Sequence, residues 1–381
     1  MRVYLDNAAT TPIDPVVAEA MKEVIDSAFG NPSSIHQEGR KSRTIIERAR
    51  KKVASLMGVG PGEIFFTSGG TEADNMAIKG SIEHLGVTHI ITSAIEHHAV
   101  LYTVQDCLTR NVSIAYVKIL PNGHVDMEHL EHLIKDAPAG RTLVTLMHAN
   151  NEIGNLLDVE RVSALCKDHN ALFHCDMVQT IGHLPINLKK TGVDFTAASA
   201  HKFNGPKGIG FIYINEELKL KPFIYGGSQE RNMRAGTENI YGIVGQVKAL
   251  EIACEEMEQQ RKQISGLRSY MKQELIENIP GVEFSGDCDG KCLYTVLSVA
   301  FPPSLSSDML LFNLDIEGIA ASGGSACSSG SDAGSHVIKA LEPKEGYTSI
   351  RFSFGKYNTR EDIDFAIAKL KSIFKLSKVE A

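Results

Sequence analysis

The sequence predicts an α/β protein with a large, mostly parallel-sheet domain followed by a smaller α+β domain. From about residue 15 to 255, short apolar runs alternate with longer amphipathic segments, which is the pattern of strands joined by crossover helices. After about residue 255 a charged helical segment is followed by short strands. The chain has 381 residues, 43% hydrophobic and 22% charged, so it is long enough for one large core and a second domain.

The expected strands of the first domain are short apolar runs. In chain order they are EIFFT (63–67), HIITS (89–93), SIAYVK (113–118), TLVTLM (142–147), ALFHCD (171–176), DFTAASA (194–200) and GIGFIYI (208–214). Helices are expected between them, for example at 42–57 and 159–170. In the second part we expect a helix at about 255–279 and strands at YTVLSVAF (294–301) and SIRFSFG (349–355).

Charge and composition argue against several classes of function. The formal net charge is −7, so the chain lacks the broad positive field of a nonspecific nucleic-acid-binding protein. The sequence contains no segment of signal-peptide or membrane-span character, and we expect a cytoplasmic protein. Seven scattered cysteines suit free thiols in a reducing compartment. Cys288 and Cys292 have no second ligand pair nearby and are interpreted as part of a surface hairpin, so we predict no metal site.

Polar residues that directly follow the expected strands are the first candidates for a site, because a doubly wound sheet builds its site at the strand ends. In TSGGTE (67–72), two glycines lead from a strand into an expected helix, whose free N–H groups could hold a phosphate. A purely structural Gly-Gly turn is an equally common alternative. Asp176 ends a strand, where a buried carboxylate needs a cationic or hydrogen-bonding partner. Lys202 lies between a strand and a glycine-rich loop, where a lysine can form a Schiff base.

Two further strands end in candidate residues. His97 follows the strand at 89–93 and could stack on a flat aromatic cofactor, although a histidine at the start of a helix is often structural. Asn151, in NNE (150–152), follows the strand at 142–147 and offers an amide. A Gly/Ser-rich stretch at 322–335 contains Cys327, and its simplest interpretation is a flexible connector.

Taken together, these segments resemble the signature blocks of group I (NifS/IscS-type) cysteine desulfurases, which belong to the class V aminotransferase family. The blocks are YLDNAATTP, GNPSSIHQEGR, FTSGGTEADN, EHHAV, MHANNEIG, HCDMVQ, SAHKFNGPKG, GGSQERNMRAGTEN, SGGSACSSG and SIRFSFG, in order from residue 4 to 355. The resemblance implies the fold-type I pyridoxal-phosphate transferase fold. It further implies a large cofactor-binding domain at 14–256 and a small domain made of 1–13 and 257–381, which carries the cysteine loop at 322–335.

The resemblance also implies roles for individual residues. Lys202 would bind pyridoxal phosphate covalently, Asp176 would pair with its ring nitrogen, and His97 would stack on the ring. Gln179 would contact the ring hydroxyl, and Asn151 and Arg351 would hold the substrate carboxylate. The phosphate would be bound by Gly70, Thr71, Ser199 and His201, and by Thr237 reaching over from a second subunit.

The implied reaction converts L-cysteine into L-alanine and leaves the sulfur on Cys327 as a persulfide. Lys202 would be the base and later the acid. The implied partners are a second copy of the chain in a homodimer with shared sites, and a sulfur-acceptor protein such as an iron–sulfur scaffold. A tRNA-thiolation relay and a nitrogenase-specific system would draw on the same site.

The sequence leaves two alternatives open, a selenocysteine lyase and another class V aminotransferase. Cys327 argues against the aminotransferase. Met177, Val178 and Gly324 depart from the usual residues of the family blocks, which affects the expected packing around the ring and the expected rates of the loop.

Overall fold

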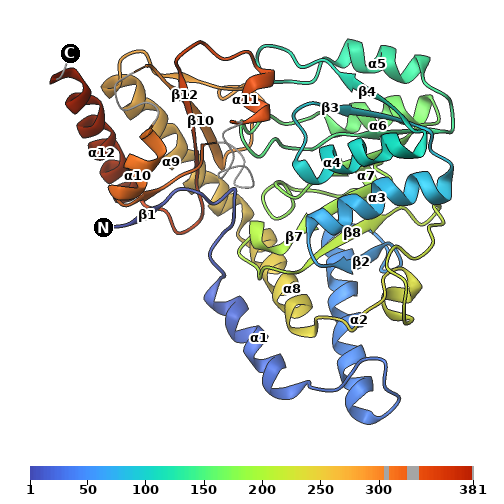
Figure 1. The fold of residues 1–381 in the computed structure, drawn as a ribbon. Coiled ribbons are helices and arrows are strands. Elements are labelled where there is room, and N and C mark those ends of the chain that lie inside the picture. The colour runs from blue at the N-terminus through green and yellow to red at the C-terminus, as the bar shows by residue number, and fades with distance from the viewer. Residues whose placement is uncertain (304–308, 324–333, 380–381) are drawn as a thin grey trace.

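The computed structural model describes residues 1–303, 309–323 and 334–379 (Figure 1). In this part of the chain, seven strands form one sheet in the order β2-β8-β7-β6-β5-β3-β4. The strands are β2 (Ile64–Thr67), β3 (His89–Ser93), β4 (Ser113–Val117), β5 (Thr142–Thr145), β6 (Leu172–Asp176), β7 (Phe195–Ser199) and β8 (Gly210–Ile214). Each lies within one of the predicted apolar runs.

The sheet is parallel from β4 to β7, and β8 runs antiparallel to both of its neighbours, β7 and β2. This confirms the prediction of a mostly parallel sheet. Because β2, β3, β5, β6 and β7 point in one direction, the residues that follow them meet at one edge of the sheet, where doubly wound proteins bind their ligands.

Helices cover both faces of this sheet (Figure 1). Alternate strand residues point to opposite faces, so that Phe66 packs into one cluster and Phe65 into another. The helices on the Phe66 face are α1 (Pro15–Ser27), α2 (Gln37–Met57), α5 (Met127–Asp136), α6 (Val159–Asp168), α7 (Leu188–Thr191) and α8 (Ile240–Glu255). The opposite face is covered by α3 (Gly70–Leu85) and α4 (His98–Cys107).

The remaining elements pack around a second large hydrophobic cluster. Its helices are α9 (Met257–Asn278), α10 (Leu310–Ile316) and α12 (Arg360–Val379), and α11 (His336–Ala340) lies nearby. An antiparallel sheet contains β9 (Glu283–Phe284), β10 (Val296–Phe301) and β12 (Thr348–Ser353), and β1 (Val3–Tyr4) pairs in parallel with β11 (Ile319–Ala320). The first strand of the chain therefore lies against its C-terminal part (Figure 1).

The short β1–β11 pairing fixes the path of the segment that follows β1. Leu5 and Asp6 continue along β12, because Ser353 N donates to Leu5 O at 2.7 Å and Asp6 bridges to Ser353. The next residues, Ala8 and Ala9, are thereby brought to the carboxyl edge of the seven-stranded sheet, although the residues at that edge are far from them in the sequence.

Cys288 lies in a turn of the connection between β9 and β10 and is partly buried, in agreement with the predicted hairpin.

Candidate active site

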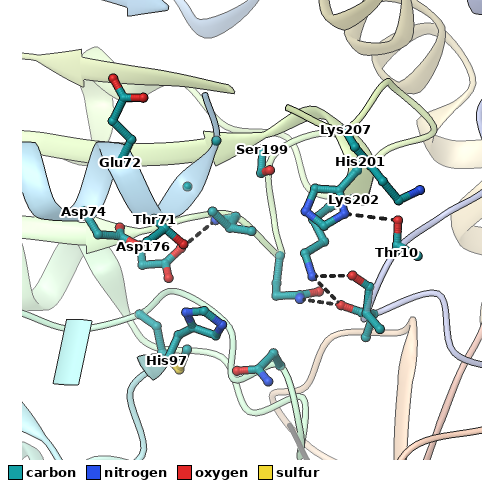
Figure 2. Close-up of a pocket in the computed structure, with 18 of the residues that line it drawn as sticks. Thr10, Thr71, Glu72, Asp74, His97, Asp176, Ser199, His201, Lys202 and Lys207 are labelled. Atoms are coloured by element: carbon teal, nitrogen blue, oxygen red, sulfur yellow. Dashed lines mark hydrogen bonds between the residues drawn. The ribbon is translucent and has the colours of Figure 1, made fainter. Parts of the chain in front are cut away.

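A cavity of about 510 Å³ opens at the carboxyl edge of the seven-stranded sheet (Figure 2). Most of the residues predicted for the site line it together. They are Gly70, Thr71, His97, Asn151, Asp176, Gln179, Ser199, His201, Lys202 and Arg351. The strand ends supply most of these residues, and Arg351 of β12 and residues 8–10 close the cavity from the other part of the chain.

The turn from β2 into α3 forms one wall of the cavity. Gly69 has a φ of +153°, a backbone conformation that side chains disfavour. A Cβ on Gly70 would lie only 2.6 Å from Val178 Cγ2. Within the described residues, no side-chain hydrogen bond caps α3 at Gly69, so the first N–H groups of the helix are available to an anion. The hydroxyl-bearing residues Thr71 and Ser199 line the same cavity.

Asp176 ends β6 with a buried carboxyl group. Val178 N donates to Asp176 Oδ1 at 2.9 Å, and the residue is 7% exposed. Burial, followed by the neighbouring carboxyl group of Asp74, raises the pKa of Asp176 to about 7. A cationic ligand atom beside Asp176 would offset both effects, because an opposite charge favours the ionised carboxylate.

Lys202 lies in a single turn after β7, within reach of the N-terminal segment. Its Nζ donates to Ala8 O at 2.7 Å and to Ala9 O at 2.9 Å. Gln179 Nε2 donates to the same Ala8 oxygen at 3.0 Å. These contacts with Ala8 and Ala9 fix the direction of the lysine side chain. The pattern of strands and helices in the sequence did not predict that this N-terminal segment would lie beside Lys202.

The histidines of the cavity are neutral near pH 7. His97 caps α4, where its Nδ1 accepts from Ala99 N at 3.1 Å. Burial, and next the charge of Lys202, lower the pKa of His97 to about 4. The pKa of His201 is also lowered to about 4, chiefly by burial, and its Nδ1 lies 3.1 Å from Thr10 Oγ1. A neutral ring at His97 can stack on a flat ligand, and His201 can form hydrogen bonds without adding charge.

Arg351 is 2% exposed and contacts two other parts of the site. Its guanidinium donates to Asn151 O at 2.8 Å and to Asp6 Oδ1 at 2.7 Å. In the described part of the chain, Arg351 Nε has no hydrogen-bond partner. A buried guanidinium with an unused N–H is suited to bind a carboxylate.

One predicted site residue is not part of the cavity lining, and another lies outside the described residues. Cys327 lies outside the described residues, as does Gly324. Thr237 is exposed and is not part of the cavity lining. Of the unusual residues, Met177 is buried in the core beneath the sheet, whereas Val178 lines the cavity and faces Gly70.

The cavity also contains residues that the sequence analysis missed, notably Asp74, Glu72 and Lys207. Asp74 is four residues after Gly70 and therefore on the same face of α3, which is a signal that helical spacing could have supplied. Glu72 accepts from Ser68 N at 2.8 Å and pairs with Arg234 at 2.8 Å. The segment that carries Thr237 is thereby joined to the β2–α3 turn.

Two other features are absent from the residues that the structure describes. No cluster of three or more His, Cys, Asp or Glu residues in the described ranges could hold a metal ion. No helix in the described chain is long and apolar enough to cross a membrane.

Comparison with known proteins places the chain in a family. The model of the family "Aminotransferase class-V" matches residues 3–365. The cysteine desulfurase IscS of Dictyoglomus turgidum is 44% identical over 376 residues, covering 97% of this chain and 94% of that protein. The putative cysteine desulfurase IscS 1 of Bacillus subtilis is 42% identical over 380 residues, covering 98% and 99%. A solved structure of a NifS-like protein superposes with a TM-score of 0.90 at 39% identity, covering 99% of this chain and 100% of its own. The chain therefore belongs to the class V aminotransferase family.

Proposed function

We propose that this protein is a cysteine desulfurase that uses pyridoxal phosphate to convert L-cysteine into L-alanine and passes the sulfur to Cys327. The observation that carries the proposal is the composition of one cavity, which is lined by Lys202, Asp176, His97 and Arg351 together. Lys202 matches a cofactor aldehyde, Asp176 a basic ring nitrogen and His97 a flat ring. Arg351 matches a substrate carboxylate. Family membership supports the same cofactor.

Pyridoxal phosphate fits the groups that the cavity offers. Asp176 would hold the protonated ring nitrogen, His97 would stack on the ring, and Gln179 would contact the ring hydroxyl. The phosphate would be bound by the open N-terminus of α3 and by Thr71, Ser199 and His201. Gly70 supports this fit, since its close approach to Val178 brings the backbone of α3 up to the floor of the cavity.

The chain's own residues would position the substrate and move its protons. Bound pyridoxal phosphate withdraws electrons from the α-carbon of an amino acid. Lys202 Nζ would remove the α-proton and later return a proton to the product. Arg351 and Asn151 would hold the substrate carboxylate.

Cys327 would complete the reaction as the nucleophile. Its thiolate would attack the substrate sulfur, so that one S–S bond forms while the substrate C–S bond breaks. Cysteine and the Cys327 thiol then yield alanine and a Cys327 persulfide, with no external oxidant or reductant. A sulfur-acceptor protein, such as an iron–sulfur scaffold, would take the terminal sulfur.

We further propose a homodimer in which Thr237 reaches the phosphate of the partner subunit. Thr237 is exposed and outside its own cavity. Large apolar side chains nearby are exposed as well, among them Phe29 at 82%, Ile35 at 87% and Tyr225 at 78%. Gln229 Nε2 donates to Ser33 Oγ at 3.2 Å, which joins these two segments into one surface.

We place the protein in the cytoplasm, where its free cysteines would remain reduced.

Incubation with L-cysteine and a thiol reductant tests the function directly. Equal amounts of sulfide and alanine are expected, because each turnover forms one persulfide and one alanine. An aminotransferase would form a keto acid instead, and a selenocysteine lyase would act on L-selenocysteine much faster than on L-cysteine. Either result would contradict the proposal.

A further inference from the structure

Three buried carboxyl groups lie close together: Asp74 and Asp176 line the cavity, and Glu96 is buried near them without lining it. Asp74 is in the first turns of α3, Glu96 follows β3, and Asp176 ends β6, with exposed fractions of 1%, 1% and 7%. Figure 2 shows Asp74 beside Asp176. Neighbouring buried carboxyl groups cannot all be ionised at low cost. Which of them carries a proton therefore determines whether Asp176 is negative.

Asp74 has a second close contact on the side of β6. Its Oδ1 lies 3.3 Å from His174 Nε2, and both residues are buried. Among the described residues, neither of these two atoms makes a hydrogen bond of standard geometry. On the other side of the ring, His174 Nδ1 lies 2.8 Å from Thr145 Oγ1. Asp74 and His174 are thus in close contact inside the protein, and Thr145 contacts the other side of the histidine ring.

The other charged groups near Asp74 and Asp176 are accounted for. Glu96 Oε1 accepts from Ser93 Oγ at 2.6 Å, and burial raises the pKa of Glu96 well above its usual range, which favours its protonated form. His97 is neutral, and Lys202 is directed toward Ala8 and Ala9. The proton balance near neutral pH is therefore decided among Asp74, His174 and Asp176.

Burial affects these three groups differently. It raises the pKa of Asp74 to about 8 and lowers that of His174 to about 4. The pKa of Asp176 is raised to about 7, first by burial and then by Asp74. Asp74 and Asp176 therefore titrate in overlapping ranges near neutral pH, where ionisation of either carboxyl group opposes ionisation of the other.

We propose that Asp74 is a positioning residue for Asp176: the two buried, neighbouring carboxyl groups resist being ionised together, so Asp74 moves to higher pH the range in which Asp176 is ionised and can receive the ring nitrogen of the cofactor. This inference rests on the proposed function, because it takes pyridoxal phosphate as the ligand. It adds a residue that acts through Asp176 and does not itself contact the cofactor.

Cofactor binding to the full-length protein stripped of cofactor tests this role. Dissociation constants are measured across pH for pyridoxal phosphate and for its analogue with CH in place of the ring nitrogen. The ratio of the two constants isolates the contact with the ring nitrogen. In the wild type, the preference for pyridoxal phosphate should be lost as the pH falls through about 7, as Asp176 becomes protonated.

Asp74→Asn should move that loss to lower pH, because the neighbouring like charge that raises the pKa of Asp176 is gone. A shift of about half a pH unit or more is expected. Asp74→Ser removes the same charge without an amide and should shift the profile in the same direction. Glu83→Gln, on the exposed side of the same helix, should leave it unchanged.

A further substitution distinguishes an electrostatic effect of Asp74 on Asp176 from a general disturbance of the site. In the Asp74→Asn background, His174→Gln should cause no additional shift near pH 7, since the pKa of His174 is about 4 and its ring carries no charge there. Equal midpoints for the wild type and both Asp74 variants would overturn the inference. If the wild type bound both cofactors equally at every pH, Asp176 would not contact the ring nitrogen, and the inference would fail independently of the sulfide and alanine assay.

Discussion

Replacing Gly70 with alanine should weaken cofactor binding while leaving the fold intact. The added Cβ would lie 2.6 Å from Val178 Cγ2, well inside the 3.5–4.0 Å at which carbon atoms normally meet. Relief requires Val178 to move, and its backbone N–H is the group that donates to Asp176 Oδ1. The strain should therefore be transmitted to the carboxylate that receives the ring nitrogen.

The expected cost is that of overpacking a well-packed site, about 1–3 kcal/mol, which corresponds to roughly 5–150-fold weaker binding of pyridoxal phosphate. Titration of cofactor-free protein, followed by the visible absorbance of the bound cofactor, measures it. Gly266→Ala is the matched control, because its Cβ meets nothing within 4 Å in the middle of α9. It should leave cofactor affinity unchanged and stabilise the fold by about 0.5–1 kcal/mol.

A second substitution at Val178 decides whether the clash is the cause. Val178→Ala in the Gly70→Ala background removes the contacting methyl groups and should restore most of the lost affinity. The reasoning would be refuted if Gly70→Ala bound the cofactor as tightly as the wild type. It would also be refuted if the double variant remained as weak as the single one.

The remaining predictions concern the site and the fold. Lys202→Ala should abolish the covalent attachment of the cofactor, and borohydride trapping with peptide mapping of the wild type should label Lys202 and no other lysine. Arg351→Ala should raise the cysteine concentration for half-maximal rate at least about tenfold, since charged hydrogen bonds are worth about 1.5–3 kcal/mol. Cofactor affinity should be largely kept. If the cysteine concentration for half-maximal rate were unchanged, another residue would bind the substrate carboxylate. Cys327→Ala should stay yellow and bind L-cysteine, yet release neither sulfide nor alanine; full sulfide production would eliminate the proposed nucleophile. Glu230→Gln should lower the free energy of unfolding by about 3–5 kcal/mol, because it removes the buried carboxylate 2.7 Å from the Arg50 guanidinium, whereas the second partner of Arg50, Glu47, is partly exposed. An unchanged denaturant midpoint would contradict this.

Local sequence patterns determined the elements of the large sheet. Each predicted apolar run contains a strand, because a short continuous apolar run, suited to a strand buried on both faces, is a property of neighbouring residues. The same patterns placed Asp176, Lys202 and His97 directly after strands, and parallel strands bring such residues to one edge. Strand and helix bounds differed by a few residues, as with α2, which begins at Gln37 and not at 42, since caps and end contacts set them.

Only the tertiary structure decided how distant segments complete the site. Ala8 and Ala9 accept from Lys202 because β1 pairs with β11 and the following residues run along β12, a pairing over more than 300 residues that no local pattern encodes. The contact of Asp74 with His174 and its effect on Asp176 likewise depend on how α3 packs across β6. Burial decides the charge of these groups, and burial is a property of the packed chain.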